Sequence, residues 1–74
     1  MTEATVIYPK YEEYKDTIVI DFGKNGISSY YMDNWDLNEL YEYLQEKFQR
    51  HPISNAEQVL NKVQEIFIQY HTQK

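Results

Sequence analysis

The chain has 74 residues, and its 12 acidic and 7 basic side chains give a formal net charge of −5. It has no cysteine and only two histidines, so disulfides and thiolate zinc sites are excluded and a histidine metal cage is not expected. The negative charge argues against direct nucleic-acid binding, which relies on lysine and arginine to neutralise phosphates.

A chain this short is expected to form one domain, residues 1–74, that buries about 60–65% of its unfolded surface. Its stability must then come from association or from packing of its aromatic residues, which are one Trp, eight Tyr and three Phe. The N-terminus lacks the basic and apolar regions of a signal peptide, and no apolar run approaches the ~20 residues of a membrane span. We therefore expect a cytoplasmic protein with no membrane contact.

Residues 2–8 end in a β-branched and aromatic run that Pro9 stops, which predicts a short edge strand. The charged, tyrosine-dotted segment 10–16 is expected to be a loop, with one helical turn as the alternative. Residues 17–22 form the clearest strand, because apolar side chains alternate there with the residues between them. The apolar side chains that would share one face are Ile18, Ile20 and Phe22.

The sequence Gly-Lys-Asn-Gly after this strand favours the positive φ values of a tight turn, so residues 17–32 are predicted to form a β-hairpin. A two-residue loop would place Phe22 opposite Ser29, whereas a four-residue loop would place it opposite Ile27. We expect the four-residue loop, because it brings Ile27 and Tyr31 onto the apolar face of the strand at residues 17–22.

An amphipathic helix is predicted over residues 33–48, and Pro52 should end it near Arg50. Its apolar stripe has the spacing of a single helix face and consists of Leu37, Leu40, Tyr41, Leu44 and Phe48.

The start of this helix has the form of a capping box, Asp36 with Glu39 three residues later, although Asp33 could cap one turn earlier. Trp35 stands where a hydrophobic staple would fold back onto Leu40.

A second helix is predicted from about Ala56, with Ser54 and Glu57 as its capping box and a frayed end over residues 71–74. Its apolar stripe is Ala56, Val59, Leu60, Val63, Ile66, Phe67 and Tyr70. The predicted fold is therefore α+β: a small antiparallel sheet of two or three strands with two C-terminal helices packed on one face.

Few residues suggest catalysis or metal binding. There is no cysteine nucleophile and no glycine-rich phosphate loop, His51 is expected to be exposed before Pro52, and His71 falls in the last helical turn. Asp33, Asp36 and Glu39 lack the glycine and distal glutamate of a calcium loop, and we interpret them as helix-capping charges. We therefore expect a protein that is not an enzyme and has no cofactor or metal.

The helix pair also suggests a helix-turn-helix, but its outward face on the second helix carries a single lysine, so DNA binding is not expected. The acidic charge instead gathers in residues 33–50, with net −3, and in residues 1–16, with net −2. Tyrosines lie in both segments, and tyrosine is enriched in protein interfaces. The candidate partner-binding residues are Asp33, Asp36, Glu39, Glu42, Tyr43, Glu46, Glu12 and Glu13.

Two functions follow from this pattern. The first is a non-enzymatic interaction module that binds a basic protein, for example an inhibitor whose carboxylates imitate nucleic-acid phosphates in a binding groove. The second is a structural or assembly module that homo-oligomerises, or joins a complex, through an open sheet face. Its apolar residues would be Val19, Tyr30 and Met32, with Ile68 on the second helix. For the acidic, tyrosine-bearing surface, the alternative is a solvated helix face that binds no partner.

Overall fold

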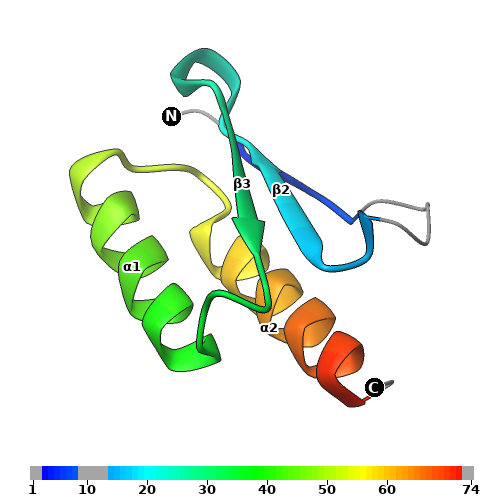
Figure 1. Cartoon of the computed structure of the whole chain (residues 1–74). Coiled ribbons are helices and arrows are strands. Elements are labelled where there is room, and N and C mark those ends of the chain that lie inside the picture. The colour runs from blue at the N-terminus through cyan, green and yellow to red at the C-terminus, as the bar shows by residue number, and fades with distance from the viewer. Residues whose placement is uncertain (1–2, 9–13, 73–74) are drawn as a thin grey trace.

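The computed structural model describes residues 3–8 and 14–72 as a three-stranded antiparallel sheet followed by two helices (Figure 1). The strand order is β1-β2-β3, so β2 is central and β1 lies at an edge, as predicted for residues 2–8. The elements are β1 (Thr5–Ile7), β2 (Thr17–Asp21), the short 3₁₀ helix η2 (Gly23–Asn25), β3 (Ile27–Tyr31), α1 (Leu37–Arg50) and α2 (Ala56–Thr72).

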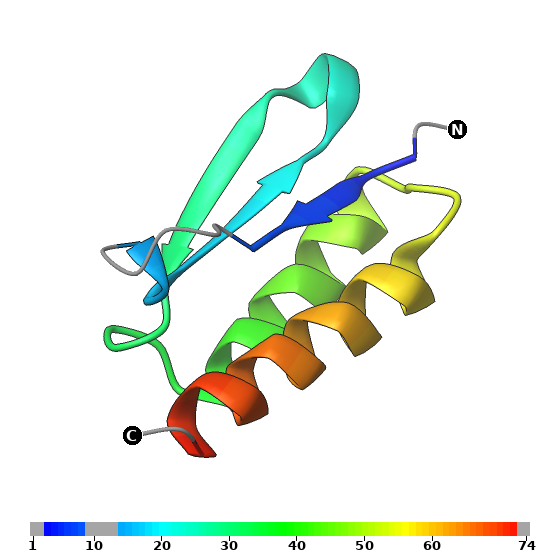
Figure 2. The same cartoon turned by 90° about the vertical axis from the view of Figure 1, so that its right-hand side faces the viewer.

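The sheet forms one layer and both helices form the other, which confirms the predicted α+β fold (Figure 2). The two helices pack against each other, and α2 also contacts β1. The core lies between the layers, where the side chains of the sheet's helix-facing side meet the apolar stripes of α1 and α2. The most deeply buried large side chains are Ile18, Ile20, Met32, Leu40, Leu44, Val59 and Val63.

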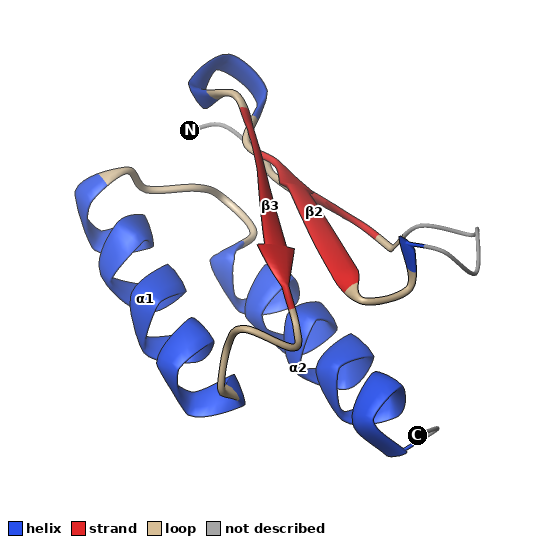
Figure 3. Ribbon diagram, in the orientation of Figure 1, coloured by secondary structure: helices blue, strands red, loops and turns tan. Residues whose placement is uncertain are grey.

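The predicted hairpin is present, but its register differs from both alternatives. Asp21 is the last β2 residue paired with β3, and its partner is Ile27, so the five residues 22–26 form the turn (Figure 3). The turn is closed by the Phe22 N–H, which donates to the Gly26 carbonyl at 2.8 Å. The Asp21 Oδ1 accepts the Gly23 N–H at 2.8 Å. This η2 turn uses one residue more than the expected four-residue loop.

A one-residue change of register moves side chains to opposite faces of the sheet. Tyr30 pairs with Ile18 and is buried, whereas Ile27 and Tyr31 point away from the helices and are exposed. The expectation that Ile27 and Tyr31 would share the core face with Phe22 is therefore wrong. Tyr30 and Met32 were expected on the open face of the sheet, and both lie in the core instead.

The α1 helix follows its predicted stripe and ends at Arg50, as expected. Leu40, Leu44 and Phe48 are buried, and Leu37 and Tyr41 pack at the margin of the core. The N-cap is Asp36, as predicted, but its side chain makes no capping hydrogen bond, so the full capping box does not form.

The α2 helix begins one residue later than its predicted capping box requires. Its first helical hydrogen bond runs from the Val59 N–H to the Asn55 carbonyl, which places Asn55, not Ser54, at the N-cap. The Asn55 side chain bonds Ala4 instead, accepting the Ala4 N–H at 2.9 Å and donating to the Ala4 carbonyl at 2.7 Å. The helix extends to Thr72, so residues 71 and 72 are helical rather than frayed.

Candidate partner-binding surface

The outer side of α1 carries a row of acidic and aromatic side chains. Asp36, Glu39, Tyr43 and Glu46 are spaced by three or four residues, so they follow one line along the helix surface. All four are exposed, and Glu42 flanks the row on its solvent side. We call these five residues the acidic face of α1. The helix therefore brings together five of the eight residues that the sequence singled out.

Of the remaining three candidates, only Asp33 is among the described residues, and it is not part of this row. The Asp33 carboxylate is directed to α2, where both of its oxygens accept the Tyr70 hydroxyl at 3.1 Å. Asp33 thus ties the loop before α1 to the end of α2. Glu12 and Glu13, with most of the predicted loop at 10–16, lie outside the described residues.

Few of the carboxylates on the acidic face are neutralised internally. Glu46 pairs with Arg50 one turn later at 3.3 Å, and both side chains are largely exposed. Such an exposed pair at this helical spacing contributes only about 0.3–0.5 kcal/mol, so a partner can readily displace it. Within the described part of the chain, Asp36, Glu39 and Glu42 form no ion pair. Their negative charge is therefore available to a partner.

Tyr43 rests on a cluster of aromatic rings between α1 and β3. Its ring lies 5.3 Å from the ring of Trp35 and 6.0 Å from that of Tyr30, measured between centroids. Trp35 and Tyr30 are also in edge contact at 6.0 Å. Trp35 was expected to pack on Leu40 as a staple; its ring contacts these two tyrosines, and its side chain packs against the buried core. The cluster holds the exposed Tyr43 ring in a fixed position within the acidic face.

Tyr30 is the buried member of this aromatic cluster. Its hydroxyl has no hydrogen-bond partner of good geometry among the described residues. Burial raises the pKa of Tyr30 above its usual 10.0; neighbouring Tyr43 adds to the shift and Ser28 opposes it. The hydroxyl is therefore neutral at physiological pH, and the cluster beneath the acidic face carries no charge of its own.

The side of the sheet that faces away from the helices forms a second exposed surface. Ile7, Ile27 and Tyr31 are 45%, 66% and 52% exposed there, and Val19 is half-buried between them. Ile68 is exposed as predicted, but it lies on α2 and belongs to the helix layer. We call Ile7, Val19, Ile27 and Tyr31 the open sheet face.

The fold and these surfaces define a small α+β domain with a charged, aromatic helix face and a sheet face on which Ile7, Ile27 and Tyr31 are exposed. Comparisons with protein-family models, with curated proteins and with solved structures find no match to this chain. In the described part of the chain, no three His, Asp or Glu side chains are gathered as metal ligands. No described helix is long and apolar enough to cross a membrane.

Proposed function

We propose that this domain is a non-enzymatic interaction module that binds a basic protein through the acidic face of α1. The observation that carries the proposal is the position of Tyr43. It is 39% exposed in the middle of the carboxylate row, and two further aromatic rings fix its orientation. An interface of this kind combines charge complementarity at its rim with an aromatic anchor at its centre.

The spacing of the carboxylates suggests the kind of surface that they would meet. Asp36 and Glu39 lie about one helical turn apart, and Glu46 lies two turns beyond Glu39 with Tyr43 between them, so the carboxylates are separated by about 4.5 Å and about 10.5 Å along the helix axis. A groove lined by lysine and arginine for nucleic-acid phosphates offers positive charges to match such a row. The proposal therefore includes an inhibitor that occupies a nucleic-acid-binding groove.

The test compares two charge-reversed double variants. Glu39→Lys/Glu46→Lys changes the acidic face, and Glu57→Lys/Glu65→Lys makes the same change in net charge on α2. Basic proteins retained from a host extract by the immobilised wild-type domain serve as ligands, and each retained protein is then titrated in purified form. We expect the α1 variant to bind at least about tenfold more weakly, because two rim charges become repulsive. The α2 variant should bind nearly as the wild type does.

The contribution of Tyr43 is separated by salt. Tyr43→Ala should weaken binding to a similar degree at low and high ionic strength, because the lost contact is apolar. The Glu39→Lys/Glu46→Lys variant should instead lose most at low ionic strength, where charges are screened least. Equal losses in the α1 and α2 double variants would show a nonspecific charge effect and would contradict the assignment to α1.

The open sheet face supports a second candidate, self-association. Ile7, Ile27 and Tyr31 expose apolar area on a side of the sheet that neither helix covers. Burial of this face between two copies would remove that area from water. Sedimentation velocity over a range of concentrations tests this candidate, with Ile27→Lys as the disrupting variant. A protein that sediments as a monomer at all concentrations would exclude it.

A further inference from the structure

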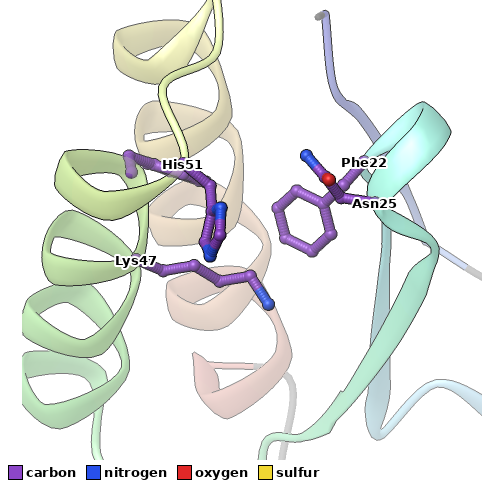
Figure 4. A pocket seen from close by; sticks show the side chains of 5 residues that line it. Phe22, Asn25, Lys47 and His51 are labelled. Carbon is purple, nitrogen blue, oxygen red and sulfur yellow. The ribbon is translucent and has the colours of Figure 1, made fainter.

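We propose that a cleft between the hairpin turn and the C-terminal end of α1 binds a small carboxylate ligand. The cleft has a volume of about 200 Å³ (Figure 4). The hairpin turn with η2 and the C-terminal end of α1 lie at the same end of the molecule (Figure 1), and the residues that line the cleft come from these two segments. Its lining residues are Phe22, Asn25, Lys47, Phe48 and His51.

The floor of the cleft is aromatic. The rings of Phe22 and Phe48 meet edge to face with their centroids 6.1 Å apart, and both side chains are buried. One ring comes from the end of β2 and the other from α1, so the floor joins the two layers of the fold. Phe48 is 8% exposed and Phe22 only 2%, so a planar or aliphatic group of a ligand would contact mainly the uncovered part of Phe48.

The rim of the cleft carries donors and positive charge. The Lys47 ammonium lies 4.6 Å from the centroid of the Phe22 ring, and the Asn25 amide and His51 imidazole face the same space (Figure 4). Among the described residues, no carboxylate pairs with Lys47. The aromatic face attracts the ammonium but accepts no conventional hydrogen bond from it, so N–H groups of Lys47 remain available.

The charge of the lining contrasts with that of the chain. No lining side chain is a carboxylate, although the protein has a net charge of −5. The last carbonyls of α1 carry partial negative charge and would repel an anion placed against the helix end. The carboxylate of the ligand is therefore expected beside the Lys47 ammonium, and its apolar body against Phe48.

The volume limits the size of the ligand. Pockets for drug-sized molecules have volumes of about 300–1,000 Å³, so this cleft is too small for a nucleotide. A monocarboxylic acid with a compact apolar body meets both the aromatic floor and the cationic rim. Inorganic phosphate meets the rim alone, and a neutral aromatic alcohol meets the floor alone.

The test is a titration of the full chain with sodium benzoate, followed by ¹⁵N-HSQC NMR. Inorganic phosphate and benzyl alcohol are titrated in parallel at the same ionic strength. We expect saturable benzoate shifts at the backbone amides of Asn25, Lys47 and His51, with a Kd in the millimolar range given the few atoms of the ligand. Both comparison compounds should bind more weakly than benzoate.

Two lysine variants complete the test. Lys47→Met keeps the apolar stem against Phe22 but removes the charge, and it should raise the Kd for benzoate about tenfold. Lys62→Met makes the same change on α2, outside the cleft, and should leave the Kd within about twofold. The NMR spectra of both variants report directly whether the fold is intact.

Three results would overturn the proposal. One is the absence of saturable benzoate shifts at the cleft residues, and another is benzoate binding that Lys47→Met leaves unchanged. The third is phosphate or benzyl alcohol binding as tightly as benzoate, because the ligand would then be recognised by charge alone or by apolar contact alone.

Discussion

The side chain of Asn55 holds the backbone of Ala4 by two hydrogen bonds, across a sequence separation of 51 residues. Ala4 immediately precedes β1, and Asn55 immediately precedes α2. An asparagine amide has both N–H donors and an oxygen acceptor, so a single side chain satisfies both backbone groups of Ala4. This contact fixes the edge strand of the sheet to the start of the second helix.

Replacement of Asn55 should therefore destabilise the fold. Asn55→Ala removes both bonds and leaves two backbone groups in a partly buried place, so we expect the free energy of unfolding to fall by about 2–3 kcal/mol. Asn55→Asp keeps the acceptor for the Ala4 N–H but sets a carboxylate oxygen against the Ala4 carbonyl, so it should also destabilise the fold. Urea denaturation measures both, and Asn61→Ala, at an exposed position of α2, is the control. Equal stability of Asn55→Ala and the control would contradict the role of this contact.

Gly26 should tolerate no side chain, for a reason that lies in its backbone. Its φ of 92° and ψ of −166° belong to a region open almost only to glycine, yet a Cβ there would meet no atom within 4 Å. We expect Gly26→Ala to lower the free energy of unfolding by about 1–3 kcal/mol through backbone strain alone. Lys24→Ala in the same turn should have little effect. Thermal denaturation of the two variants, followed by circular dichroism, distinguishes them.

The buried hydroxyl of Tyr30 should make the fold sensitive to alkaline pH. Burial raises its pKa in the folded state above 10.0. Above that pH the unfolded chain releases the proton while the folded chain retains it, so stability falls as pH rises toward the folded pKa. Below pH 10 the hydroxyl keeps its proton in both the folded and the unfolded chain, so titration of Tyr30 costs no stability there. Denaturation at a series of pH values should show a smaller alkaline loss in Tyr30→Phe than in the wild type.

The same substitution has a second expected result at neutral pH. Because the Tyr30 hydroxyl lacks a well-formed hydrogen bond among the described residues, its removal should leave stability unchanged or slightly higher. Tyr31→Phe, at the next position on the opposite face of the sheet, is the matched control for both measurements. If it reduced the alkaline loss as much as Tyr30→Phe does, the effect could not be assigned to the buried hydroxyl.

The fluorescence of Trp35 should be sensitive to changes at Tyr43 in the acidic face, because the two rings lie 5.3 Å apart. It is the single tryptophan of the chain. Tyr43→Ala uncovers one side of the indole, so its fluorescence emission should move to longer wavelength, with a loss of about 1 kcal/mol of stability. Tyr31→Ala removes a tyrosine from the open sheet face and should leave the emission unchanged. An unshifted spectrum in Tyr43→Ala would contradict the ring contact.

The periodic elements could be predicted from the sequence, whereas the hairpin turn could not. The apolar stripes of α1 and α2 repeat over several turns, so each position supports the same assignment. The register depends instead on one turn, where the Asp21 carboxylate accepts the Gly23 N–H and an extra residue enters the loop. The conformation of this turn therefore sets which face Tyr30 and Tyr31 occupy.

The candidate partner-binding surface could likewise be predicted from the sequence only in part. The row from Asp36 to Glu46 could be predicted because it follows helical spacing alone. Its aromatic support could not, because Tyr30 reaches Tyr43 from β3 only in the observed register. The cleft was missed for a related reason: it joins Phe22 and Asn25 to Lys47 through tertiary packing, and no sequence spacing relates those residues.

The order of charges along α1 has a consequence for how the molecule meets another. Its first turns carry Asp36 and Glu39, and its last turn carries Lys47 and Arg50. The side chains therefore give the helix an electric moment along its axis, which the backbone dipole of the helix opposes in part. A positively charged surface exerts a torque on such a moment and turns the molecule during diffusion, with the acidic end of α1 leading. The orientation of the first collision with a basic surface is thus biased before any contact forms.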